Sequence, residues 1–431
     1  MLNAAVNSGA IVLLLFGLFS PISGLLVYYA FTFLHLQHFA YSDFGIPYAR
    51  LAVLATVVGW LAMREKRSLP MHPALGLLGC LLVWMIFSSL TARLPSLAWP
   101  LWLDFLKIAF SVVLTAALLT NRLRLHAFVW MVVLSIGFYA AKGGLYTIVT
   151  AGGGDVVGPP SSQLATNNGL SRGLVMTLPL VVYLALHSEL RWVRLGFYAA
   201  GALFLIALLG TDSRGGQVAF AAMLVVFWLR SRRKLALMVL GMILIGSVVA
   251  MLPTQRLDLW VERITTVGQE ETFASEESFA GRIWAWKLAL RIAGDNPLTG
   301  GGFQAYRAYP YQIDAAGRVV VKDWHNNYFD MLGEHGYVGL AIYLGLIAVV
   351  MNANRRTRIM TRDRPDLFWA RDMAILMNIA IIGYLVGGLT ISHANFELFY
   401  AFVGATVALH AVARREIAQS AVPRAALAAR A

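Results

Sequence analysis

The chain has 431 residues, of which 59% are hydrophobic and only 13% are charged, and its mean hydropathy is +0.67. Soluble domains carry about twice this fraction of charged residues, so the composition excludes an ordinary soluble protein. The net charge of +13 is spread over short segments between apolar runs, which argues against a nucleic-acid-binding face. The single cysteine, Cys80, lies inside an apolar run and excludes a disulfide framework and a thiolate metal site.

Apolar runs of roughly 17–25 residues recur along the chain, and each is long enough to cross a hydrocarbon core of about 30 Å as a helix. We therefore predict an all-α polytopic membrane protein with about twelve transmembrane helices. Because of Pro21, the first span can be either one kinked helix or two short helices. The predicted spans are 10–34, 47–63, 74–91, 102–120, 126–150, 170–188, 193–211, 215–229, 235–252, 328–352, 373–391 and 397–413.

Most of the 35 lysines and arginines fall in short loops on one side of these spans. The positive-inside rule assigns that side to the cytoplasm, and an even number of spans then places both termini there. The first basic residue is Arg50, so the N-terminus lacks the charged region of a cleavable signal peptide, and we expect its first span to be retained.

One long loop reaches the opposite, extracytoplasmic face and is large enough to form a small subdomain containing interfacial helices. The predicted organisation is transmembrane helices one to nine in 1–252, the loop subdomain in 253–327, the last three transmembrane helices in 328–413, and a cytoplasmic tail in 414–431. Several basic residues fall on this face against the orientation rule. They are Arg172, Arg214, Arg282, Lys287, Arg291 and Arg307.

Arg214 follows a span directly and is followed by Gly215 and Gly216, which permit a tight turn at the membrane boundary. An arginine at this depth is costly unless it is paired, so it is a functional candidate. Asp212 offers the alternative of a plain structural salt bridge.

Arg282 lies near the start of a predicted amphipathic helix whose tryptophans suit the membrane interface. A helix lying flat on the outer leaflet would hold Arg282 level with lipid phosphates. The alternative is an interfacial helix whose arginines only contact headgroups. The apolar residues at helical spacing are Phe279, Ile283, Trp286 and Leu290.

His325 lies at the entrance of the tenth span, where the chain continues Asn326-Asn327 to Gly333-Glu334-His335-Gly336. An imidazole can accept a proton near neutral pH, which suits a general base acting on a hydroxyl group. The alternative is a helix cap without a catalytic role. The glycine-rich segment 297–303 lacks the ending of a phosphate-binding loop and predicts a tight turn.

Carboxylates give no sign of a metal site, because no Asp-x-Asp triplet occurs in the sequence. We therefore predict neither a metal nor another cofactor. Asp104 and Lys107, three residues apart in the fourth span, can neutralise each other within the helix.

The segment from His325 to Gly339 resembles the signature of the O-antigen ligase and O-antigen polymerase superfamily of bacterial membrane glycosyltransferases. The turn at Arg214 and the Gly281-Arg282 element, in the same order, resemble its other functional elements. The segments 158–160, 167–168 and 297–303 further resemble the ligase-like branch found beside exosortase systems.

The resemblance implies an inner-membrane enzyme that transfers a glycan from undecaprenyl diphosphate to an acceptor hydroxyl on the periplasmic face, without metal. It implies that Arg214 and Arg282 bind the diphosphate and that His325 assists the acceptor, with Glu334 as an alternative base. We expect inversion at the anomeric carbon, because no covalent nucleophile stands out. The further predicted substrate-binding residues are Arg172, Lys142, Asn326, Glu334 and Arg291.

Three acceptors fit this chemistry: the lipid A-core for a ligase, another glycan for a polymerase, and a protein hydroxyl for an O-linked protein glycosyltransferase. Membrane lipids are expected partners and nucleic acid is not. A transporter of lipid-linked oligosaccharides is the alternative of another class, since twelve spans also suit it. Transporter sites gather near the midplane, however, whereas the unusual polar residues here lie at one membrane boundary.

Overall fold

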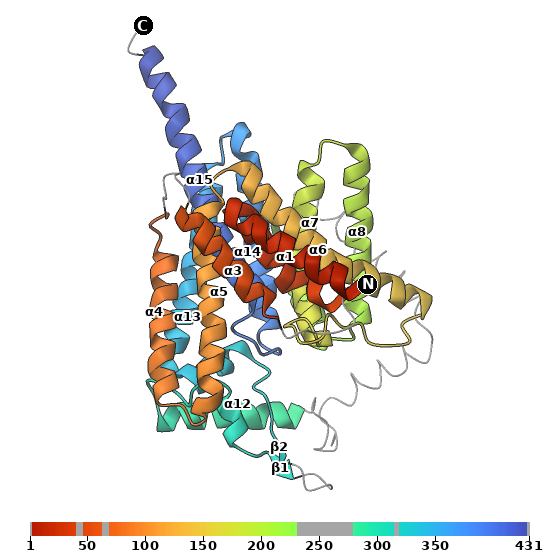
Figure 1. Ribbon diagram of the computed structural model, residues 1–431, viewed down its shortest axis with the longest axis vertical. Coiled ribbons are helices and arrows are strands. Elements are labelled where there is room, and N and C mark those ends of the chain that lie inside the picture. Colours follow the sequence, from red (N-terminus) through yellow and green to blue (C-terminus); the bar gives the residue numbers. More distant parts are fainter. Residues whose placement is uncertain (1, 40–45, 63–68, 231–278, 314–318, 429–431) are drawn as a thin grey trace.

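The computed structural model describes residues 2–39, 46–62, 69–230, 279–313 and 319–428 (Figure 1). The described chain is helical except for one short hairpin, in which β1 (Gln312–Ile313) pairs antiparallel with β2 (Val319–Val320). The α-helices are α1 (Leu2–Phe19), α2 (Pro21–Tyr29), α3 (Tyr48–Ala62), α4 (Pro73–Leu90), α5 (Pro95–Leu118), α6 (Arg122–Val149), α7 (Asn167–His187), α8 (Arg191–Gly210), α9 (Arg214–Arg230), α12 (Phe279–Asp295), α13 (Asn327–Met360), α14 (Phe368–Gly387) and α15 (Glu397–Ala428). Short 3-10 or π-helical turns are η1 (Ala30–Leu34), η2 (Leu36–Phe39), η3 (Ala305–Ala308) and η4 (Pro365–Leu367).

Within the described ranges, seven helices are long and apolar enough to cross a membrane: α4 to α8, α13, and α14 together with η4. The predicted all-α membrane-type fold is thereby confirmed. Shorter apolar helices occupy the predicted first, second and eighth spans. The predicted ninth span, 235–252, and the first part of the loop subdomain lie outside the described residues. The total of twelve spans and the orientation therefore stay predictions.

The first predicted span is two helices, not one. The chain breaks at Ser20, whose φ of −139° and ψ of 94° are extended, and Pro21 starts α2 at a position where its missing N–H costs nothing. Helices α1 and α2 then pack against each other. A Cβ on Gly24 would lie 2.7 Å from the Cα of Gly17, so this close approach requires glycine.

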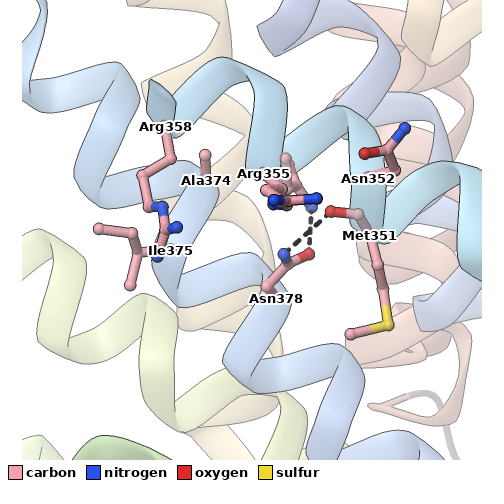
Figure 2. A pocket seen from close by; sticks show the side chains of 8 residues that line it. Met351, Asn352, Arg355, Arg358, Ala374, Ile375 and Asn378 are labelled. Carbon is pink, nitrogen blue, oxygen red and sulfur yellow. Dashed lines mark hydrogen bonds between the residues drawn. The ribbon is translucent and has the colours of Figure 1, made fainter. Parts of the chain in front are cut away.

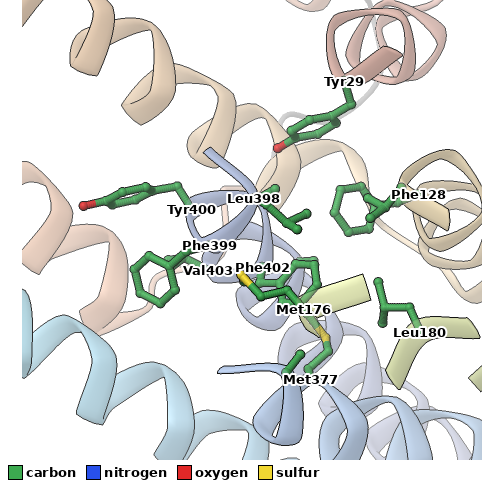
Figure 3. Packing of buried hydrophobic residues seen from close by; sticks show 14 of the residues in the cluster. Tyr29, Phe128, Met176, Leu180, Met377, Leu398, Phe399, Tyr400, Phe402 and Val403 are labelled. Atoms are coloured by element: carbon green, nitrogen blue, oxygen red, sulfur yellow. The ribbon is translucent and has the colours of Figure 1, made fainter. Parts of the chain in front are cut away.

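The centre of the bundle is built around the first turns of α15. Figure 3 shows Phe399, Phe402 and Val403 of this helix among side chains of α7 and α14, including Met176 and Met377. These residues are fully or almost fully buried. The start of α15, and the loop that precedes it, are therefore fixed from several sides.

Helix α12 runs across one end of the bundle, below the ends of α4, α5 and α13 in Figure 1. It packs on α13 and forms a small second core with Ala285, Ala289 and Ile292 against Trp324. Leu290, expected on its apolar face, is 48% exposed. The buried face is therefore rotated from the predicted one and contains Leu288 as well as the two alanines and Ile292. We refer to this part of the molecule as the α12 end.

Helix α13 is interrupted at Gly336, whose φ of 68° is left-handed. The predicted turn at 297–303 docks at this break: the N–H groups of Gly301 and Gly302 donate to the carbonyls of Gly333 and Glu334, each at 2.9 Å. The break leaves helix carbonyls without intrahelical donors, and the N–H groups of the turn take the place of those donors. The backbone of the Gly-Glu-His-Gly segment thus serves the fold.

The ionisable residues of α5 find partners on other helices. Arg50 Nη2 lies 2.8 Å from Asp104 Oδ1, and Lys107 Nζ lies 2.7 Å from Glu397 Oε1. The closest partner of each group is therefore not the predicted one, although the charges of Asp104 and Lys107 also attract each other. Each group is paired across a helix interface instead.

Candidate active site

Helix α12 and the segment before α13 bring Arg282 towards His325. The indole of Trp286 donates to the carbonyl of Trp324 at 2.9 Å, and its ring stacks on Phe329 at 5.4 Å between centroids. Arg282 is one helical turn from Trp286, on the same face of α12. This packing brings the start of α12 towards the residue that follows Trp324, which is His325, and the positive charge of Arg282 acts on its imidazole.

His325 is partly buried, and its φ of 46° is left-handed. Burial lowers the pKa of its imidazole below the ordinary 6.5. The negative charge of Asp323 opposes this effect, whereas the positive charges of Arg282 and Lys322 lower the pKa further. At neutral pH the imidazole is therefore a neutral, proton-accepting group next to two cations and a carboxylate.

The loop of residues 388–396, which we call the α14–α15 loop, closes the site from the other side. Asp323 Oδ1 accepts a hydrogen bond from the hydroxyl of Ser392 at 3.1 Å. Asp330 Oδ2 accepts from the backbone N–H groups of His393 at 3.2 Å and Ala394 at 2.9 Å. His393 is in turn close enough to His325 to affect its pKa. Two carboxylates thus hold this loop against His325.

Asn326 fixes the start of α13 and the same loop together. Its Oδ1 accepts from the N–H groups of Tyr328 at 2.9 Å and Phe329 at 3.2 Å, which is an N-cap. Its Nδ2 donates to the carbonyl of Leu389 at 2.9 Å. Asn326 is 4% exposed. Its amide is therefore used within the protein and positions its neighbour His325.

Arg172, a predicted diphosphate ligand, is 2% exposed on α7. Its guanidinium donates to the carbonyls of Ile391 at 2.6 Å and His393 at 3.1 Å. It also lies over the rings of Tyr384 and Phe396, 5.6 and 5.3 Å from their centroids. Arg172 therefore supports the backbone of the α14–α15 loop from inside the bundle.

Arg214 is exposed at the first position of α9, in a turn that packs on the same loop. A Cβ on Gly215 would lie 2.4 Å from Thr390 Oγ1, so only glycine permits this approach. On the other side, Ser213 and Asn168 share a hydrogen bond of 2.6 Å. The turn of Arg214 and the segment of His325 thus pack against one loop.

A pocket of about 70 Å³ opens beside these groups, lined by residues that include Asp323, Asp330, Glu334 and His393. Glu334 is 6% exposed, and its Oε1 accepts from the N–H of Gln304 at 2.8 Å and from the indole of Trp324 at 3.2 Å. Arg214, Arg282 and His325 do not line this pocket. Their convergence on a single diphosphate therefore stays a prediction.

Two predicted substrate-binding residues lie farther out. Arg291 is exposed on α12, and Lys142 is exposed on α6. Over the part of the chain that the structure describes, no cluster of three or more His, Cys, Asp or Glu side chains has the arrangement of a metal site.

The sequence did not point to the α14–α15 loop as part of the site. Its polar run, Thr390-Ile391-Ser392-His393, interrupts two apolar segments and was the available signal. Asp323 and Asp330 were missed as well, because their partners lie about 60–70 residues away in the sequence.

Two segments of the chain match known families. Residues 199–344 match the O-antigen ligase family, and residues 1–189 match a family of unknown function (DUF5935). No curated protein matches the chain. The first match includes Arg214, Arg282 and His325, and it confirms the resemblance to the O-antigen ligase superfamily. It supports a membrane glycosyltransferase-like function in O-antigen or related glycan assembly.

Proposed function

We propose that this protein transfers a glycan from undecaprenyl diphosphate to an acceptor hydroxyl at the periplasmic face, because residues 199–344 match the O-antigen ligase family. We assign it the ligase reaction, without metal and with inversion at the anomeric carbon. The observation that supports the proposal is the packing of α12 on the segment before α13, which brings Arg282 within electrostatic range of His325 at the α12 end.

The donor needs cations where negative charge develops on the departing diphosphate. A guanidinium offers two parallel donors and stays charged when it is dehydrated, so Arg282 and Arg214 suit this role. Helix α12 runs across the end of the bundle (Figure 1), which would hold Arg282 at the level of lipid phosphates. Arg291, exposed on the same helix, is a further contact for the diphosphate or for headgroups. Lys142 is a second, weaker candidate.

The acceptor hydroxyl loses its proton to the imidazole of His325 as its oxygen attacks the anomeric carbon. The bond from that carbon to the diphosphate oxygen breaks, and the electron pair leaves with undecaprenyl diphosphate. Glu334 remains the alternative base, since it is among the residues that line the pocket. Arg172 and Asn326 act as positioning residues in this scheme, because their polar groups bind the backbone around His325.

Purified protein in proteoliposomes, supplied with undecaprenyl diphosphate-linked glycan, tests the proposal. Lipid A-core, a second donor molecule and an acceptor peptide are offered separately, and products are identified by mass spectrometry. We expect joining to lipid A-core, unchanged by a chelator and lost in His325→Ala. Joining only to the second donor or only to the peptide would reassign the acceptor. Movement of donor across the bilayer without joining would establish transport instead.

A further inference from the structure

A second pocket, of about 400 Å³, opens between α13 and α14 at the end of the molecule remote from His325. Its position on α13 is about 40 Å from the start of that helix by helical rise. The volume falls within the range of small-ligand sites. Figure 2 shows Arg355 above Asn378, with Arg358 beside Ile375. The proposed transferase site uses none of these residues.

The two arginines give the pocket a positive charge that no acidic side chain in its lining offsets. Neither Arg355 nor Arg358 takes part in an ion pair with any described residue. The arginine at 364 and the one at 371, by contrast, are each paired with an aspartate. Two unpaired guanidinium groups around one cavity favour an anion with several acceptor oxygens, as a phosphate has.

The carboxamide side chains in the pocket wall indicate that the ligand also carries a hydrogen-bond donor. Asn354 is 0% exposed, and its Nδ2 donates to Asn378 Oδ1 at 3.0 Å and to Thr406 Oγ1 at 3.2 Å. Asn378 donates in turn to the carbonyl of Met351 at 3.1 Å. The Oδ1 of Asn354, however, is buried without a hydrogen-bond partner. Buried acceptors of this kind call for a donor, which a bare phosphate diester does not supply.

We propose that this pocket binds the headgroup of an anionic glycerophospholipid that carries both a phosphate and a hydroxyl. Arg355 and Arg358 bind the phosphate, and a headgroup hydroxyl donates to Asn354 Oδ1. The walls belong to two helices of membrane-spanning length, and Met351, Ala374 and Ile375 provide apolar surface next to the charges. A lipid can enter such a site laterally with its acyl chains outside. Basic pockets between membrane helices bind lipid headgroups in this way.

The test compares lipid binding by the full-length protein in detergent, measured by native mass spectrometry during titration. The probes are phosphatidylglycerol, zwitterionic phosphatidylcholine, and soluble inorganic phosphate as a competitor. The variant Arg355→Gln/Arg358→Gln removes both cations from the pocket. Arg356→Gln/Arg362→Gln is the matched control, because it removes the same charge from exposed arginines outside the pocket.

We expect phosphatidylglycerol to bind at least about tenfold more tightly than phosphatidylcholine, and the pocket variant to lose at least this factor while the control retains it. Equal losses of phosphatidylglycerol affinity in both variants would show that the lipid responds to general surface charge, and would overturn the proposed site. Wild-type affinity in the pocket variant would overturn it as well. Displacement of the lipid by inorganic phosphate at comparable concentration would overturn the lipid assignment in favour of a free anion. A circular-dichroism spectrum and melting curve for each variant verify that it is folded.

Discussion

The carboxylate of Asp330, in the first turn of α13, accepts a hydrogen bond of 3.2 Å from the backbone N–H of His393. His393 has a φ of 92°, in the left-handed region that favours glycine. This strained conformation of His393, next to His325, needs stabilising contacts from its surroundings, and the half-buried carboxylate of Asp330 provides one. Arg172 provides a second one from the other side by donating a hydrogen bond to the carbonyl of His393.

Asp330 tests whether this loop positions the site or takes part in the chemistry. In Asp330→Ala the two hydrogen bonds to the loop are lost, and we expect the transfer rate to fall by at least about tenfold. Asp330→Asn keeps an acceptor oxygen for both N–H groups and should restore most of the activity. A proton-transferring carboxylate would instead be disabled by both substitutions. Initial rates in proteoliposomes measure the difference.

Arg282 should be required for its geometry as well as for its charge. We expect Arg282→Ala to reduce transfer by about a hundredfold or more, as for other lost charge stabilisation, with normal protein level in the membrane. Arg282→Lys should recover little, because an ammonium cannot form two parallel bonds to phosphate oxygens. Lys287→Ala, an exposed cation on the same helix, is the control and should transfer normally.

Arg214 is predicted to behave as Arg282 does, and its loss tests whether the two guanidinium groups act on one substrate. We expect Arg214→Ala to lower transfer to a similar extent. If the two arginines bind the same diphosphate, the double variant should lose less than the product of the single losses, since removing one already misplaces the donor. Activity of Arg214→Ala and Arg282→Ala within a few-fold of the wild type would contradict the diphosphate assignment.

The pH dependence of transfer should follow the imidazole of His325. Burial lowers its pKa below 6.5, so the reactive neutral form dominates at neutral pH and is lost as the pH falls through this lowered pKa. Asp323 raises the pKa and Lys322 lowers it. Asp323→Asn should therefore move the acidic limb of the rate profile to lower pH, and Lys322→Gln should move it to higher pH. If the acidic limb of the rate profile stays at the wild-type pH in both variants, the base is another group.

The sequence predicted most helices of this fold, because a membrane-spanning helix can be recognised from the length of a single apolar run. At Ser20 the sequence left one kinked helix or two short helices open, and the structure has two, which approach closely at Gly17 and Gly24. On α12, periodicity favoured large apolar residues, yet Leu290 is exposed. The small Ala289 packs near Gly333 instead, and a Cβ added to Gly333 would lie 3.2 Å from the Cβ of Ala289. Small residues allow helices to approach this closely.

The site was predictable only in part. His325, Arg282 and Arg214 stood out individually, because charged or titratable groups at a membrane boundary are unusual. The roles of Arg172 and Asn326 could not be foreseen, because their partners are backbone carbonyls of the α14–α15 loop, more than 60 residues away. A carbonyl has no signature in the sequence, so a buried arginine bound to one looks the same as a ligand-binding arginine until the fold is known.

Replacing Gly336, at the break in α13, should lower the stability of the protein. An alanine there would adopt a φ of 68°, and its Cβ would lie 2.3 Å from the carbonyl oxygen of Leu298. The left-handed conformation and this contact together predict a loss of at least about 2 kcal/mol in the free energy of unfolding. Gly345→Ala is the matched control on the same helix, since its Cβ would meet only Leu77 Cδ1 at an ordinary 3.8 Å. Thermal unfolding in detergent should show a lower midpoint for Gly336→Ala alone. Equal midpoints for both variants would show that the break in α13 tolerates a side chain, and that the docked glycine turn does not depend on it.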